Sequence, residues 1–188
     1  MQAVEENNPS EKNRARELVG MVVYIVLLLA AVFLINTFVA QRTQVNGMSM
    51  YPTLDDQDHL IADKISYRFV DPKRYDIIVF PYQHEENTYY IKRIIGLPGE
   101  TIQITGGTIY IDGEVLEEDY GRETMLTGGI AEEPITLGED EYFVLGDNRN
   151  NSKDSRDGMV GVIHREDIIG RTFLRIWPLN KFGILKHQ

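Results

Sequence analysis

The chain contains no cysteine. Disulfide bonds, thiol nucleophiles and thiolate metal sites are therefore excluded, and the fold must be stabilised by its core alone. Histidine is scarce as well, and the positions of His59, His84, His164 and His187 show none of the close spacing of metal ligands. We expect neither a metal ion nor any other cofactor.

Basic residues are outnumbered by acidic ones. The 188 residues include 19 Lys and Arg against 29 Asp and Glu, so the net charge is −10. Residues 1–42 contain four charges of each sign, which places the whole excess after residue 42. Nucleic acids are bound by basic surfaces. We therefore expect no nucleic-acid partner.

One long segment lacks charge entirely. Residues 18–40 form an uncharged, mainly apolar run of 23 residues, and as a helix it would extend roughly 35 Å, enough to cross a hydrocarbon core of about 30 Å. A cleavable secretory signal is the alternative, but its apolar region is usually about 7–15 residues and ends in a small-x-small site. Phe38-Val39-Ala40 does not provide that site. The run predicts an uncleaved transmembrane helix over 18–40, with the lipid bilayer as a partner.

The flanks of this run predict its orientation. Lys12, Arg14 and Arg16 precede it, and only Arg42 follows closely. Cytoplasmic flanks carry the excess of Lys and Arg. We expect a cytoplasmic segment over 1–17 and an extracytoplasmic domain over 41–188, as in a single-pass type II protein of the cell membrane.

After the run, short β-branched and aromatic stretches alternate with Gly, Pro, Asn and Asp, which is typical of an all-β domain. Asp112-Gly113 between two such stretches predicts a two-residue hairpin turn. The acidic stretch 117–140 is weakly periodic, so we expect a short cap or excursion at about 105–140. We expect Trp177 in the core, with insertion into the membrane interface as the alternative. The predicted strands are 59–65, 76–80, 88–95, 101–104, 108–111, 114–116, 141–145 and 168–176.

A serine lies in a constrained turn close behind the membrane run, in Gly47-Met48-Ser49-Met50-Tyr51-Pro52-Thr53. Pro52 fixes its own φ and disfavours helix at Tyr51, while Gly47 permits backbone geometry that a side chain would forbid. Ser49 is therefore expected on a rigid bend, which is able to present a nucleophile. A purely structural turn is the alternative.

A lysine lies within the apolar strand 88–95. Strand alternation places Lys92 beside Tyr90 and Ile94 on one face and Arg93 on the other. Burial lowers the pKa of a lysine, and the resulting neutral amine is able to take a proton from a serine. The alternative is that Lys92 extends to solvent from an edge strand.

The third segment, Gly146-Asp147-Asn148-Arg149-Asn150-Asn151-Ser152-Lys153-Asp154-Ser155-Arg156, follows the apolar strand 141–145. Its acids, arginines and serines indicate either a solvated loop or a hydrogen-bonded scaffold that holds the lysine in place.

In this order, the three segments closely resemble the signature boxes of bacterial type I signal peptidases. A weaker fourth box is 74–80, with Tyr75 where the family often has glycine, and the ending Arg175-Ile176-Trp177-Pro178 is similar too. The resemblance covers the chain from the membrane run almost to its end. It implies a mostly antiparallel β-sheet catalytic domain of signal peptidase type, preceded by one N-terminal transmembrane helix.

The resemblance also implies a serine endopeptidase that cleaves signal peptides from secretory preproteins after small-x-small (Ala-x-Ala) sites. Ser49 would be the nucleophile and Lys92 the general base, so no metal or cofactor is required. Ser152 would hydrogen-bond the Lys92 ammonium and orient it. A supporting ion-pair network would consist of Arg93, Asp147, Arg149, Asp154 and Arg156.

The chain departs from part of the family at Gly47. Members from Gram-negative bacteria usually have a serine there as a second oxyanion donor, so here the Ser49 backbone N–H is the expected donor and the second one stays open. This glycine and the single membrane run are similar to enzymes of Gram-positive bacteria. We expect a monomer.

Three other interpretations compete. The self-cleaving repressor family also resembles a Ser/Lys dyad on a β fold, but the membrane run and the acidic domain oppose it. A hydrolase that pairs Ser49 with His164 and an aspartate would not need Lys92. The third is a catalytically inactive, membrane-anchored β-domain that binds peptides.

Overall fold

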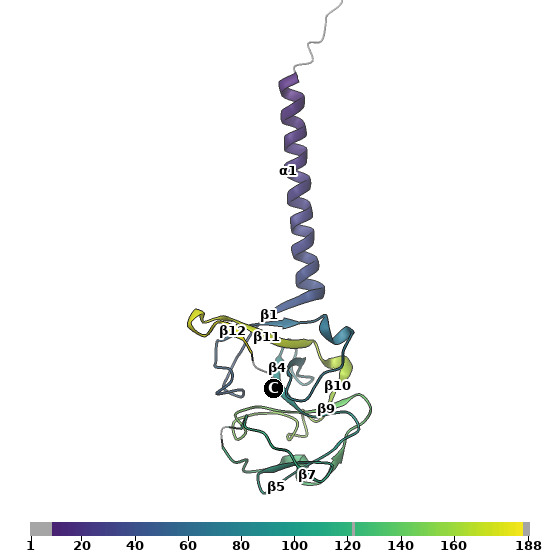
Figure 1. Ribbon diagram of the computed structural model, residues 1–188, viewed down its shortest axis with the longest axis vertical. Helices are drawn as coiled ribbons and strands as arrows, with labels where there is room; N and C mark the ends of the chain where they lie inside the picture. Colours follow the sequence, from purple (N-terminus) through teal and green to yellow (C-terminus); the bar gives the residue numbers. More distant parts are fainter. Residues whose placement is uncertain (1–8, 122, 186–188) are drawn as a thin grey trace, which may run out of the picture. The chain divides into compact units, whose positions relative to one another are not determined.

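The computed structural model describes residues 9–121 and 123–185 (Figure 1). Residues 1–8 of the predicted N-terminal segment lie outside the described residues, and so does His187. The chain divides into two compact units, Met1–Val39 and Ala40–Gln188.

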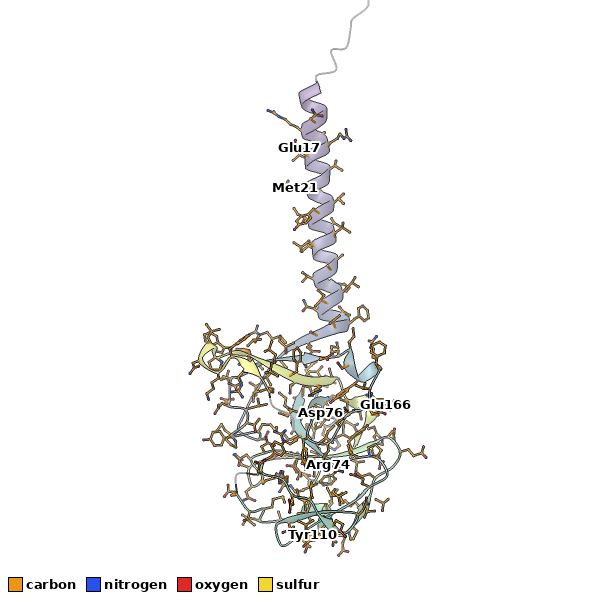
Figure 2. The ribbon with its side chains drawn as sticks, viewed as in Figure 1. Glu17, Met21, Arg74, Asp76, Tyr110 and Glu166 are labelled. Carbon is orange, nitrogen blue, oxygen red and sulfur yellow. The ribbon has the colours of Figure 1, made fainter. Side chains whose placement is uncertain are left out.

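The first unit is helical. The helix α1 spans Pro9–Leu34 and is followed by a π-helical turn over Ile35–Val39. Side chains such as Met21 project outward along it in Figure 2, and its apolar ones are exposed. The segment Asn13–Val39, 27 residues long, is long and apolar enough to cross a membrane. Because α1 begins at Pro9, it starts inside the predicted segment 1–17, and proline is common in the first turn of a helix.

The second unit is built on an antiparallel sheet of eight strands in the order β1-β2-β11-β3-β4-β9-β10, with β12 paired to β11. The predicted fold class, a mostly antiparallel β domain after an N-terminal apolar helix, is confirmed. The strands are β1 (Ala40–Gln44), β2 (His59–Asp63), β3 (Ile77–Pro81), β4 (Tyr89–Gly96), β9 (Glu141–Leu145), β10 (Ile163–His164), β11 (Gly170–Trp177) and β12 (Gly183–Ile184).

A second sheet of four strands has the order β7-β6-β5-β8. Its strands are β5 (Thr101–Thr105), β6 (Thr108–Ile111), β7 (Glu114–Val115) and β8 (Ile135–Thr136). Asp112 and Gly113 have φ of 51° and 85°, so the predicted two-residue hairpin turn is confirmed. In Figure 1 this sheet lies at the end of the domain opposite β11 and β12. The excursion thus includes a sheet of its own, which starts at Thr101.

β3 and β4 are buried on both faces. Ile77 and Val79 of β3 pack in one apolar cluster, and Ile78 and Phe80 pack in another. Since β4 lies between β3 and β9, Lys92 is on a central strand. The alternative that Lys92 extends to solvent from an edge strand is wrong.

Some elements differ from the sequence-based expectation. β8, β10 and β12 have only two residues each, too few to show any alternation. Four short 3-10 helices also lie in loops that carry no periodic pattern. Trp177 is 51% exposed at the end of β11, so its predicted place in the core is wrong. The 3-10 helices are Ser66–Arg68, Gly129–Glu132, Arg165–Asp167 and Leu179–Lys181.

Candidate active site

The turn that carries Ser49 is held by short-range hydrogen bonds. Gly47 has φ of +94°, a left-handed conformation that favours glycine. Its N–H donates to Asp56 Oδ1 at 2.7 Å, and the Tyr51 N–H donates to the Met48 carbonyl at 3.1 Å. The rigid bend that the sequence predicts around Ser49 is therefore present, with Gly47 in the conformation that the sequence requires.

A residue of the polar loop 146–156 fastens this turn from the other side. The Asn148 backbone N–H donates to the Ser49 carbonyl at 3.0 Å, and its side-chain amide donates to the Met48 carbonyl at 3.0 Å. Sequence reasoning missed Asn148, because an asparagine in a polar loop carries no signal for a particular partner. The loop and the turn thus form one hydrogen-bonded unit.

Lys92 extends from β4 to Ser49. Its Nζ lies 2.8 Å from Ser49 Oγ and also donates to the Ile91 carbonyl at 3.0 Å. The side chain lies over the Tyr90 ring, with Nζ at 4.9 Å from the ring centroid, and the residue is only 3% exposed. The serine and the lysine are therefore within hydrogen-bond reach, as nucleophile and base must be.

Burial lowers the pKa of Lys92 to about 8, while the nearby carboxylates of Asp154 and Asp147 oppose the shift. With this pKa, Lys92 is neutral in roughly a tenth of the molecules at pH 7. A neutral amine has a free lone pair, which is able to accept a proton. The site thus supplies a base in the physiological pH range.

The Ser49 backbone N–H makes no hydrogen bond within the described part of the chain. It is available as a donor to a developing oxyanion. Gly47 offers no side chain there, and its N–H is already bonded to Asp56.

The structure places Ser152 beside this unit but does not join it to Lys92. Among the described residues, Ser152 Oγ is buried and has no hydrogen-bond partner, so the predicted bond to the Lys92 ammonium is not formed. A Cβ on Gly146 would lie 2.2 Å from Ser152 Oγ and 2.4 Å from the Ser49 carbonyl oxygen. Ser152 and the turn around Ser49 therefore approach each other at Gly146.

Arg93 and Asp147 form a fully buried ion pair. Arg93 Nε and one terminal nitrogen donate to the two Asp147 oxygens at 2.9 and 2.7 Å. Asp147 also accepts a hydrogen bond from the hydroxyl of Thr53, a residue of the turn around Ser49. This bidentate pair links β4, the polar loop and the turn.

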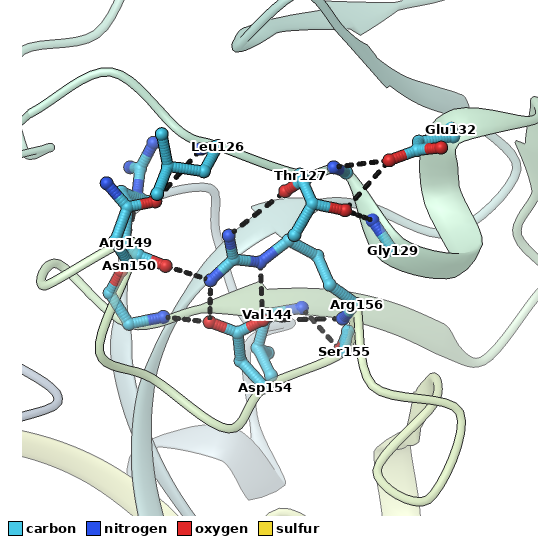
Figure 3. A network of polar contacts seen from close by, with 12 residues as sticks. Leu126, Thr127, Gly129, Glu132, Val144, Arg149, Asn150, Asp154, Ser155 and Arg156 are labelled. Atoms are coloured by element: carbon cyan, nitrogen blue, oxygen red, sulfur yellow. Dashed lines mark hydrogen bonds and ion pairs between the residues drawn. The ribbon is translucent and has the colours of Figure 1, made fainter.

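A second pair stabilises the polar loop from within, as Figure 3 shows. Arg156 donates from Nε and from one terminal nitrogen to the Asp154 oxygens, both at 2.8 Å. Asp154 in turn accepts from the Gly146 N–H at 3.0 Å. Arg156 also donates to the Arg149 carbonyl. The loop is thus held in one conformation by its own charges.

The side chain of Arg149 belongs to neither of these two ion pairs. It forms an ion pair with Glu118, a residue of the excursion, and donates to the Gly146 carbonyl at 3.2 Å. Tyr120, two residues further on, covers Arg93, with Arg93 Cζ 3.6 Å from the ring centroid. Sequence reasoning missed Glu118 and Tyr120, because the acidic excursion shows no pattern that assigns partners.

A cleft of about 220 Å³ opens beside Ser49 and Lys92. The turn around Ser49 and β4 line it, with Ser49, Lys92 and Met50 among the lining residues. His164 does not line the cleft, and its Nδ1 faces Asp140 at 3.7 Å. Lys92 rather than His164 is therefore beside Ser49.

The sequence of this chain is similar to those of known proteins. Residues 18–177 match the family model described as signal peptidase, peptidase S26. A signal peptidase I of Leptolyngbya laminosa is 45% identical over 158 residues, which cover 80% of this chain and 75% of the relative. Signal peptidase I P of Bacillus subtilis subsp. natto is 37% identical over 180 residues, covering 91% and 95%. A crystal structure of a signal peptidase I from Enterococcus faecalis V583 is 35% identical, with a TM-score of 0.43, and covers 54% of this chain and 97% of that one.

Proposed function

This chain belongs to the signal peptidase family, peptidase S26, and is a peptidase; from that premise we propose that it is a membrane-anchored serine endopeptidase that cleaves exported preproteins with Ser49 as nucleophile and Lys92 as general base. The observation that carries the proposal is the 2.8 Å contact between Lys92 Nζ and Ser49 Oγ. Burial supports it by lowering the pKa of Lys92 to about 8.

Acylation begins with neutral Lys92. Its amine takes the proton of Ser49 Oγ as the oxygen attacks the scissile carbonyl carbon. The tetrahedral oxyanion accepts a hydrogen bond from the Ser49 N–H. The Lys92 ammonium then gives its proton to the leaving amine, the C–N bond breaks, and the acyl group stays on Ser49.

Deacylation repeats these steps with water. Lys92, neutral again, takes a proton from the water that attacks the ester carbonyl. The second tetrahedral intermediate collapses, the C–O bond to Ser49 breaks, and the ammonium returns the proton to Ser49 Oγ. The product carboxylate leaves and the enzyme is restored.

The surrounding residues hold this geometry and take no proton. Arg93 and Asp147 hold the turn to β4, and Arg156 and Asp154 hold the polar loop. Arg149 fastens the loop to the excursion. We assign Ser152 the orienting role on Lys92 that the family match implies, in a state where its hydroxyl turns toward the ammonium.

The cleft suits small side chains. About 220 Å³ is below the roughly 300–1,000 Å³ of pockets for drug-sized ligands. Alanine side chains at the first and third positions before the scissile bond would fit into the cleft without displacing Met50. An extended substrate would add as a strand beside the site.

The apolar helix sets the location. We propose that α1 crosses the cell membrane with Lys12, Arg14 and Arg16 on the cytoplasmic side. The catalytic domain is then extracytoplasmic, and the tether raises its effective concentration near emerging signal peptides. All residues of the site come from one chain, so a monomer suffices.

The test is cleavage of a preprotein by the full-length protein in detergent. Mass spectrometry should show one cut, directly after an Ala-x-Ala site. Replacing the alanine before the cut by leucine should lower kcat/KM at least about a hundredfold, because a shallow pocket that accepts a methyl group does not admit the larger branched side chain. No cleavage of any preprotein, with Ser49→Ala indistinguishable from wild type, would support the inactive peptide-binding domain instead.

A further inference from the structure

A second lysine lines the active-site cleft. Lys153 lies in the polar loop, and its side chain reaches the cleft that contains Ser49 and Lys92. Its Nζ donates to Tyr82 Oη at 2.6 Å and lies 4.7 Å from the Tyr82 ring centroid. The Tyr82 ring stacks on Tyr90, with centroids 4.7 Å apart and planes at 6°. Lys153 is thus held at the cleft wall by an aromatic pair.

The partners of Lys153 are neutral. Besides its bond to Tyr82 Oη, the Lys153 Nζ lies 4.0 Å from Met159 Sδ, and within the described residues Lys153 forms no ion pair. The hydrogen bond with Tyr82 raises the pKa of Lys153, which keeps the ammonium charged. Asp157 acts on this charge electrostatically, but from beyond the distance of an ion pair, so the ammonium is not paired with a carboxylate among the described residues.

The charge of the cleft contrasts with that of the chain. No aspartate or glutamate is among the described residues that line the cleft, although the chain has a net charge of −10. Lys92 must be neutral when it acts as a base. In that form the cleft retains one formal charge among these residues, the ammonium of Lys153. Such a site favours an anionic group in whatever enters it.

We propose that Lys153 binds a carboxylate side chain of the preprotein close to the scissile bond and thereby makes the enzyme prefer substrates with Asp or Glu at the facing position. This inference rests on the proposed function. An ammonium has three N–H donors, and Tyr82 occupies one of them, so donors remain for a carboxylate. The aromatic wall reduces the freedom of the side chain before the substrate binds.

The test compares kcat/KM for precursor peptides in neutral detergent. Each peptide carries Glu, Gln or Lys at one position, either two residues before the cut or one or two after it. Each rate is divided by that of the matched Gln peptide for the same enzyme variant. At one position wild type should prefer Glu over Gln about fivefold, the upper range for an accessible ion pair.

The variants separate this contact from other effects. Lys153→Gln should bring the Glu/Gln ratio to about one, and Lys153→Glu should reverse the preference toward the Lys peptide. Tyr82→Phe removes the hydroxyl acceptor and keeps the ring, so it should change the ratio without abolishing it. Lys73→Gln is the matched control, since Lys73 is an exposed lysine that does not line the cleft, and it should keep the wild-type ratio. Raising the salt concentration should weaken the wild-type preference.

Equal Glu/Gln ratios in wild type and Lys153→Gln at every position would overturn the proposal. A dependence on Lys153 that appears only in vesicles with anionic lipid would also overturn it, since the partner would then be a lipid headgroup. Failure of the proposed function is distinguishable, because the Gln peptides themselves would then remain uncut.

Discussion

At the scale of single residues, burial decides the chemistry of this protein. Lys92 is an ordinary lysine in the sequence, and its position among apolar side chains on a central strand lowers its pKa to about 8, as the proposed role of base requires. The sequence predicted Ser49 and Lys92 through its resemblance to signal peptidases, because turn residues and strand alternation alone left a structural turn and a solvent-exposed lysine open. It did not predict Asn148, Glu118 or Tyr120, since their partners lie in distant segments.

The pH dependence of catalysis follows from the lowered pKa of Lys92. The free enzyme is active when Lys92 is neutral, so kcat/KM should rise with pH and level off above a midpoint near 8. A pH series with a neutral precursor peptide measures this midpoint. A flat profile between pH 6 and about 9 would contradict the role of Lys92 as base.

Stability should depend on the same group. The folded-state pKa of about 8 lies below the ordinary lysine pKa of 10.5, so folding disfavours the charged form at pH 7. Lys92→Met should therefore raise the free energy of unfolding at pH 7 by about 1–2 kcal/mol. The penalty in wild type disappears as pH rises from about 8 to 10.5, and the gain should disappear with it. Unfolding curves in detergent at pH 7 and above 10 test both parts.

At the scale of elements, the site depends on close contact between two loops. The turn around Ser49 and the loop 146–156 meet at Gly146, where no side chain would fit. Tyr75 has φ of +72°, a conformation that glycine adopts more readily than tyrosine, and its carbonyl accepts a hydrogen bond from Arg93. The sequence predicted the long strands from their alternation, but not this loop contact, because alternation says nothing about loops.

Gly146→Ala should separate these loops. The new Cβ would lie 2.2 Å from Ser152 Oγ and 2.4 Å from the Ser49 carbonyl oxygen, so the nucleophile must move. Small displacements of a nucleophile lower kcat by about a hundredfold. Gly183→Ala in β12 is the matched control, since its Cβ meets nothing within 4 Å. Similar kcat values for the two variants would show that the contact at Gly146 is unimportant.

At the scale of the whole molecule, an apolar helix and a β domain follow each other directly in the sequence, with α1 and its π-helical turn ending at Val39 and β1 beginning at Ala40. The sequence predicted this division from one uncharged run. It also predicted three strands of the four-stranded sheet, at 101–104, 108–111 and 114–116, but not β8, which has two residues and is too short to show alternation.

The absence of cysteine provides a direct test of orientation. Single cysteines are introduced as Ser10→Cys near the start of α1 and Glu139→Cys at an exposed site in the domain. A membrane-impermeant maleimide added to intact cells should label the Glu139→Cys variant and spare the Ser10→Cys variant. Permeabilised cells should show labelling of both. The reverse pattern in intact cells would place the domain in the cytoplasm.

The central claim is that Lys92 activates Ser49, and the most direct measurement is the single-turnover rate of preprotein cleavage by Ser49→Ala, Lys92→Ala and His164→Ala beside wild type. We predict that the first two variants lose at least about a thousandfold in rate, as expected when a nucleophile or its base is removed, and that His164→Ala stays within about twofold of wild type. Activity that survives in Lys92→Ala and is lost in His164→Ala would contradict the account.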